Sequence, residues 1–230
     1  MELLKKIKAK EWLIFLGILA LFLLVDYFVV YIYYMSGSDL YDLTMIDKVF
    51  ILFSKYIFLI AIFVIRDFKY LKTKWIDFKK NFKKYFAISF KNWFAGFLIM
   101  FVSNILINYF IPGLGQNESS VQTLIAKLPV IAFILTTICA PFVEEMVFRK
   151  YLRDCVDNKI LYMILSGLIF GLVHTAFNTN ILELILIIPY GALGFMFAKT
   201  IAETDNIYTT IMMHMFHNGV LTLIAIWGLF

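Results

Sequence analysis

Two adjacent carboxylates and three histidines are the side chains of this sequence whose types and spacing suit chemistry. Glu144 and Glu145 lie in the stretch 141–153, which reads Pro-Phe-Val-Glu-Glu-Met-Val-Phe-Arg-Lys-Tyr-Leu-Arg and ends a long apolar run. The chain has three histidines, and all lie in apolar segments after that pair: His174, His214 and His217. Hydrocarbon cannot solvate charge, so ionisable groups in such segments indicate a functional site.

The two glutamates face different directions if the stretch is a helix. A helix advances about 100° per residue, so Glu145 and Arg149 lie about 40° apart on one face, whereas Glu144 and Arg149 lie about 140° apart. We therefore predict an ion pair between Glu145 and Arg149 and a Glu144 side chain that faces the bundle. Pro141 is expected to kink the helix just before the pair. The alternative is that both glutamates are solvated at the membrane edge, because basic residues follow them.

His174 is predicted to lie at the depth of Glu144. If the turn between their segments falls near 157–159, Glu144 comes about 13 residues before it and His174 about 15 after it, so both lie on the order of 20 Å from the turn. An antiparallel hairpin then brings the carboxylate and the imidazole to one level. Gly167 and Gly171 precede His174 at a spacing that allows close approach of another helix.

His214 and Asn218 share one face of the last apolar segment, and His217 lies beside them. A carboxylate and an imidazole at one depth can deprotonate a shared water, and a second imidazole and a carboxamide can stabilise an oxyanion. Together these groups predict amide hydrolysis. Alternatively, Glu144, His174 and His214 could hold a divalent metal such as zinc with water in the open position, although no HExxH motif is present. The sequence leaves open whether the cofactor is such a metal or none.

The composition predicts an all-α, polytopic transmembrane helical bundle that positions these groups. Of the 230 residues, 62% are hydrophobic and 25 are Phe, and the mean hydropathy is +0.85, which is too apolar for a soluble domain. Several runs exceed the roughly 20 residues that cross a bilayer. We expect about seven spans (six to eight), with the first run retained as a span, at about 11–35, 47–66, 82–110, 121–155, 158–176, 181–203 and 207–229.

Charge in the connections predicts the orientation. The N-terminus, the connection from Arg66 to Lys84 and the connection from Arg149 to Lys159 are basic, whereas the connections between them are not. By the positive-inside rule the N-terminus is cytosolic. The stretch from Trp75 to Lys84 is expected to be either an amphipathic helix along the inner leaflet or a lysine-rich solvated loop. Basic residues flank spans rather than forming a domain, which argues against nucleic acid as a partner.

We expect two regions on either side of the loop that contains Pro112, Gly113 and Gly115. Residues 1–115 form an N-terminal three-span region with the basic cytosolic connection, and residues 121–230 form a catalytic core of four spans. Asp26 and Lys55, in the first two spans, are expected to make structural contacts between helices.

The polar residues of the core resemble those of a known family. Three motifs occur in order on successive apolar segments: Glu144-Glu145-x-x-x-Arg149, Phe170-x-x-x-His174 and His214-x-x-x-Asn218. Together they resemble the signature of the CAAX-protease and bacteriocin-processing family of intramembrane endopeptidases, from about Val121 onwards.

The resemblance implies a role for each motif residue. Glu144 and His174 would activate water, and His214 and Asn218 would stabilise the oxyanion. His217 is outside the family pattern and is carried as an accessory candidate.

The resulting hypothesis is an intramembrane endopeptidase of the bacterial cell membrane. Its site is open to the cytosolic side, and its substrate is a membrane-associated or amphipathic peptide or protein from bacteriocin maturation, self-immunity or CAAX-type processing. One alternative is a non-catalytic membrane immunity or binding protein. A second is a proton-coupled transporter, which the clustering of polar groups in one half and the lack of an inverted repeat disfavour.

Overall fold

The computed structural model describes residues 8–35, 44–112, 116–175 and 181–228, and the described chain is helical with no strand. The elements are α1 (Ala9–Met35), α2 (Met45–Lys80), α3 (Phe82–Phe110), α4 (Gln116–Lys127), α5 (Pro129–Phe133), η3 (Ile134–Cys139), α6 (Ala140–Glu145), η4 (Met146–Tyr151), α7 (Leu152–Cys155), α8 (Lys159–Thr175), η5 (Ile181–Leu186), α9 (Ile187–Thr204) and α10 (Ile207–Ile226). Elements α5 to α7 follow one another without a break, and we call them the glutamate rod.

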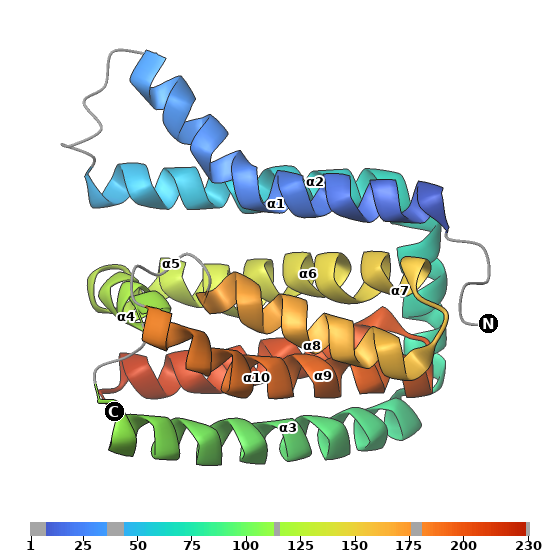
Figure 1. The fold of residues 1–230 in the computed structure, drawn as a ribbon. Helices are drawn as coiled ribbons and strands as arrows, with labels where there is room; N and C mark the ends of the chain where they lie inside the picture. Colours follow the sequence, from blue (N-terminus) through green and yellow to red (C-terminus); the bar gives the residue numbers. More distant parts are fainter. Residues whose placement is uncertain (1–7, 36–43, 113–115, 176–180, 229–230) are drawn as a thin grey trace.

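The predicted helical membrane bundle is confirmed. Among the described residues, six helical stretches are long and apolar enough to cross a membrane, and α8 is a seventh, shorter apolar helix. Figure 1 shows α1 and α2 as one layer, the glutamate rod and α8 beneath it, then α9 and α10, and α3 at the far edge. Consecutive long elements run in opposite directions. The end where α1 and α10 begin also holds the α7–α8 and α9–α10 turns, and we call it the basic end.

Two predicted boundaries were wrong. The helix expected over 121–155 is interrupted at Leu128 (φ −142°, ψ 65°), because the residue before a proline is disfavoured in the helical region. The segment before it is the separate helix α4. The helix expected over 47–66 instead continues to Lys80, with non-helical dihedrals at Asp67 (φ −108°, ψ 20°). The alternative of a lysine-rich solvated loop from Trp75 to Lys84 is therefore also wrong, because residues 75–80 and 82–84 are helical.

Local sequence signals explain several helix ends. Thr44 and Asp47 form a capping box at the start of α2, since the Thr44 hydroxyl accepts from the Asp47 N–H and the Asp47 carboxylate accepts from the Thr44 N–H. Asp205 ends α9 in the left-handed region (φ 50°), and the next residue, Asn206, caps α10 by accepting from the Tyr208 N–H. The α9–α10 turn is consequently very short.

Polar contacts hold the first layer together and join it to the rest of the bundle. Asp26 of α1 and Lys55 of α2 form an ion pair of 2.7 Å, and the Lys55 ammonium lies 4.5 Å from the Phe22 ring centre. These two residues thus make the structural helix contact that the sequence predicted. At the bend of α2, the Tyr151 hydroxyl donates to Asp67, and the Lys150 ammonium lies 3.0 Å from the same carboxylate. The bend is therefore held by the glutamate rod.

Small residues let α8 and α9 approach closely, as the glycine spacing predicted. A Cβ atom on Gly167 would lie 2.8 Å from the carbonyl oxygen of Gly191, and one on Gly171 would lie 2.9 Å from that of Ile187. Both contacts are to backbone, which cannot rotate away. The position of α8, and with it that of His174, depends on these glycines.

Gly167→Leu is expected to destabilise the protein by about 1–3 kcal/mol, because overpacking forces the two helices apart. The measurement is the thermal unfolding midpoint in detergent. Gly17→Leu is the matched control, since a Cβ on Gly17 would meet no atom within 4 Å. Equal midpoints for both variants would contradict the close-packing account.

Candidate active site

Glu144 lies where two histidines from different helices meet. Its Oε2 atom is 4.0 Å from Nε2 of His174 on α8 and 3.8 Å from Nε2 of His214 on α10. Glu144 and His214 are buried, and the His174 side chain is 17% exposed. The structure therefore brings together three of the residues that the sequence singled out, from segments up to 70 positions apart.

The geometry between Glu144 and His174 suits a bridging water. Nδ1 of His174 lies 2.7 Å from the carbonyl oxygen of Phe170, and since a carbonyl only accepts, Nδ1 is the donor. In the neutral ring, Nε2 is then an acceptor, and it faces a carboxylate oxygen that is also an acceptor. A separation of 4.0 Å is too long for a direct hydrogen bond. A water that donates one O–H to each acceptor satisfies both.

Glu145 contacts His214 on its other side, which the sequence did not predict. Nδ1 of His214 lies 2.9 Å from Oε1 of Glu145, while Nε of Arg149 lies 3.3 Å from Oε2 of the same carboxylate. Glu145 and Arg149 are fully buried. The expected partner of Glu145 is thus present, and the carboxylate also orients the His214 ring. The signal for a second partner was that a buried carboxylate has two oxygens and accepts more than one hydrogen bond.

Aromatic rings enclose the Arg149 guanidinium. Its central carbon lies 4.5 Å from the Phe170 ring centre and 5.6 Å from that of Phe197. Its terminal nitrogens have no hydrogen-bond partner within the described part of the chain. The Glu145 carboxylate and the faces of these rings therefore stabilise the Arg149 cation, which water does not reach. The Phe170 ring also contacts the His174 ring in a tilted arrangement, with ring centres 4.3 Å apart.

The glutamate rod is not a regular α-helix. Six-residue π-helical segments, η3 and η4, lie on either side of α6, and the Ala140 N–H donates to the carbonyl five residues back, at Leu135. In the same register the Thr136 carbonyl would accept a hydrogen bond from the N–H of residue 141, but Pro141 has no N–H. The irregularity predicted at Pro141 thus takes the form of a π-helical turn, a feature frequent at functional sites.

The side chain of Asn218, on α10, donates a hydrogen bond to the Thr136 carbonyl, to which Pro141 cannot donate because it has no N–H. Its Nδ2 atom donates to the Thr136 carbonyl oxygen at 2.9 Å. This contact anchors the carboxamide against the rod that carries Glu144, and it leaves the second N–H of the amide for another acceptor.

His217 packs against α3. Its Nδ1 atom accepts from the Trp93 indole N–H at 3.4 Å, and its ring contacts the rings of Trp93 and Phe97. The accessory candidate is therefore held in an aromatic pocket.

The zinc alternative stays a hypothesis, which the described side chains do not by themselves support. Across residues 8–35, 44–112, 116–175 and 181–228, no group of three or more His, Cys, Asp or Glu side chains is placed so that it could hold a metal ion. This includes Glu144, His174 and His214.

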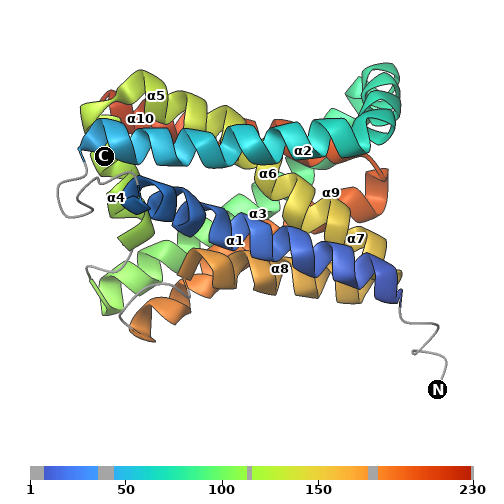
Figure 2. The same cartoon turned by 90° about the horizontal axis from the view of Figure 1, so that it is seen from above.

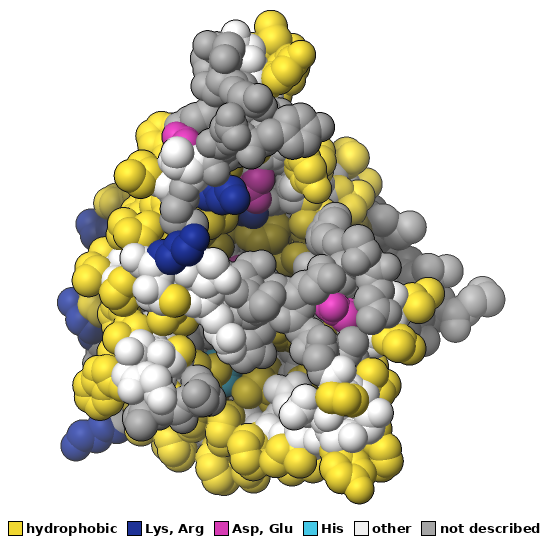
Figure 3. All heavy atoms as spheres, turned by 90° about the vertical axis from the view of Figure 1, so that its left-hand side faces the viewer, with side chains coloured by type: hydrophobic (Ala, Val, Ile, Leu, Met, Phe, Trp, Pro, Cys, Tyr) yellow, Lys and Arg dark blue, Asp and Glu magenta, His cyan; other side chains and the backbone are white. Residues whose placement is uncertain are grey.

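The end opposite the basic end gives a view into the bundle. Figure 3 shows an apolar recess there and, separately, a histidine side chain visible between surface groups. His174 is the second-last residue of α8, whose final turn lies at this end. The opening of the site toward the cytosol stays a prediction.

Comparison with known proteins gives the family. Residues 126–220 match the family model described as type II CAAX prenyl endopeptidase Rce1-like, a range that contains Glu144, His174, His214 and Asn218. The chain is also 30% identical over 136 residues to the UPF0177 protein YbdI of Lactococcus lactis, covering 55% of this chain and 73% of that protein. This chain belongs to the Rce1-like CAAX-protease and bacteriocin-processing family.

Other relatives of this family member extend the comparison. It is 29% identical over 132 residues to the "Putative membrane peptidase YdiL" of Bacillus subtilis, covering 54% of this chain and 51% of that protein, so the match spans about half the length of that relative. An uncharacterized protein of Mycoplasma capricolum is 29% identical over 211 residues, or 85% of this chain, and that match reaches into the N-terminal spans. No solved structure matches the chain significantly.

Proposed function

We propose that the protein is an intramembrane endopeptidase that hydrolyses a peptide bond in a membrane-associated or amphipathic peptide or protein. The observation that carries the proposal is the meeting of Glu144 Oε2 with the Nε2 atoms of His174 and His214, from three helices inside a membrane bundle. Family membership and a relative named as a membrane peptidase support it.

Glu144 and His174 are assigned to the activation of water. A water between them transfers a proton to Glu144 as its oxygen attacks the carbonyl carbon of the scissile bond. Glu144 then returns this proton to the leaving amine. The low-dielectric surroundings strengthen each electrostatic contact along this path.

His214 and Asn218 are assigned to the oxyanion. Because Nδ1 of His214 already donates to Glu145, Nε2 can donate only when the ring is an imidazolium, and the Glu145 carboxylate compensates that charge. The free N–H of Asn218 supplies a second donor. Removal of one such donor typically costs about 10²–10³ in kcat.

The test is cleavage by purified protein in lipid nanodiscs, with a pool of amphipathic and C-terminally prenylated peptides analysed by mass spectrometry. His174→Ala is expected to lower cleavage by roughly 10²–10⁴-fold. The matched control is His217→Gln, whose side chain can still accept from Trp93 and which should retain most activity. A strong chelator should leave cleavage unchanged. Absence of cleavage of every peptide by the wild-type protein would refute the proposal.

A further inference from the structure

Residues 68–84, which we call the arm, form a helical segment outside the candidate site. After the bend at Asp67 the arm turns across the basic end of the bundle and reaches from the level of α2 to that of α3. Figure 2 shows the arm almost end-on beside the long part of α2, so the two parts of α2 run in clearly different directions. The arm therefore lies across the ends of the spans.

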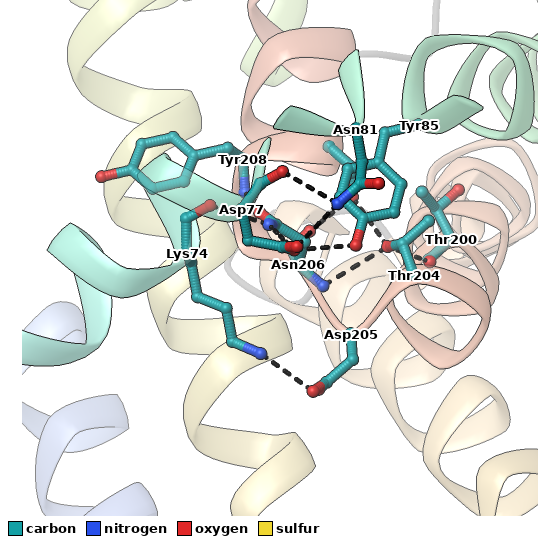
Figure 4. A network of polar contacts seen from close by, with 10 residues as sticks. Lys74, Asp77, Asn81, Tyr85, Thr200, Thr204, Asp205, Asn206 and Tyr208 are labelled. Atoms are coloured by element: carbon teal, nitrogen blue, oxygen red, sulfur yellow. Dashed lines mark hydrogen bonds and ion pairs between the residues drawn. The ribbon is translucent and has the colours of Figure 1, made fainter. Parts of the chain in front are cut away.

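A polar network fixes the inner face of the arm to the α9–α10 turn (Figure 4). The Nδ2 atom of fully buried Asn206 donates to the Lys74 carbonyl at 2.8 Å and to Asp77 Oδ2 at 2.9 Å. The Tyr85 hydroxyl donates to the same carboxylate oxygen at 2.7 Å, and the Lys74 ammonium pairs with Asp205 at 2.8 Å. These contacts hold the arm in one rotation about its axis, so its opposite face is always directed outward.

The outward face has an apolar edge and a basic edge. Phe68 and Trp75 lie about 20° apart on one edge, whereas Lys69 and Lys80 lie about 20° apart on the other, roughly 120° away. The exposed side chains of Lys72, Ile76 and Lys79 lie between the two edges. Phe68 is 60% exposed and Trp75 is 44% exposed. A lysine-rich helix in water would bury such rings and expose its charges alone. The exposed cations of the arm are Lys69, Lys72, Lys79, Lys80, Lys83 and Lys84.

Aromatic rings connect the apolar edge to the membrane span α3. Ring centres 5.6–6.3 Å apart follow one another from the arm into that span: Trp75, Phe78, Phe82, Phe86, Phe90 and Phe94. Because α3 is long and apolar enough to cross a bilayer, this row places the apolar edge at the hydrocarbon boundary. The basic edge then lies at headgroup level, where lysine stems run along apolar surface and the ammonium groups reach phosphate.

We propose that the arm is a binding site for anionic lipid headgroups of the leaflet at the basic end. Six exposed lysines on a clamped helix match the negative charge of such headgroups, and the apolar edge excludes a partner that is wholly aqueous. The proposal is independent of the peptidase activity.

Native mass spectrometry of the detergent-purified chain tests the proposal. The probes are phosphatidylglycerol and phosphatidylcholine with identical acyl chains, and glycerol phosphate as the soluble anion. We expect the wild-type protein to retain phosphatidylglycerol preferentially. Lys80→Gln/Lys84→Gln should reduce that preference by roughly five-fold for each lysine removed. Lys48→Gln/Lys127→Gln removes equal charge from exposed positions at the opposite end and should leave the preference unchanged.

Three results would overturn the proposal: equal retention of both lipids by the wild-type protein, an unchanged preference in the arm variant, or displacement of phosphatidylglycerol by glycerol phosphate at similar concentration. Circular dichroism checks that the arm variant is folded. If it is not, salt titration of the wild-type protein decides instead, since a headgroup contact at the surface weakens with ionic strength and an apolar one does not.

Discussion

Glu144→Gln is expected to abolish peptide cleavage while the protein stays folded. Glutamine has the shape of glutamate but cannot take a proton from water, so kcat/KM should fall by roughly 10²–10⁴-fold. Among the described residues, the ion-pair partners of Glu144 within 4.0 Å are the two imidazoles, so the substitution leaves no Lys or Arg without its counter-charge. The measurement compares kcat/KM with the thermal unfolding midpoint of the same sample.

Glu203→Gln is the control for the same chemical change elsewhere. Glu203 is a half-exposed carboxylate of α9 that accepts a hydrogen bond from Asn92 and lies 4.0 Å from Lys199. It should keep near wild-type cleavage. A folded Glu144→Gln variant that cleaves at the wild-type rate would exclude Glu144 as the base. If the protein instead confers immunity by binding, protection should survive in the Glu144→Gln variant.

The helices of this protein could be predicted because their signals are local. Long apolar runs, separated by charged connections, predicted all seven main helical segments. The glycine pair on α8 predicted the close approach of another helix, which is α9. The errors have local causes as well. The restriction imposed by Pro129 on Leu128 is readable in the sequence, but the continuation of α2 past Asp67 depends on Lys150 and Tyr151 of a distant segment.

The contacts of the site could be predicted only where both residues lie on one helix or on the two helices of one hairpin. The angular argument placed Arg149 beside Glu145, and the hairpin argument placed His174 at the depth of Glu144. The contact between Glu145 and His214 depends on how α10 packs against the rod. The anchoring of Asn218 depends on a π-helical register, which an ideal period of 3.6 residues does not describe.

Glu145→Ala is expected to destabilise the protein by about 3–5 kcal/mol, because it leaves the Arg149 guanidinium buried without a counter-charge. It also removes the acceptor that orients His214. Loss of cleavage in this variant therefore has two sources, one through stability and one through the imidazole. A second variant is needed to separate them.

Glu145→Gln/Arg149→Met provides that separation. It removes both buried charges at similar volume, so its unfolding free energy should recover most of the loss seen in Glu145→Ala. Cleavage should stay at least 10²-fold below wild type, because the carboxylate that contacts Nδ1 of His214, and so orients the ring and compensates an imidazolium there, is removed. Recovery of both stability and cleavage would mean that Glu145 serves only as the counter-ion of Arg149. Recovery of stability alone is the expected result, and it assigns Glu145 the positioning of His214.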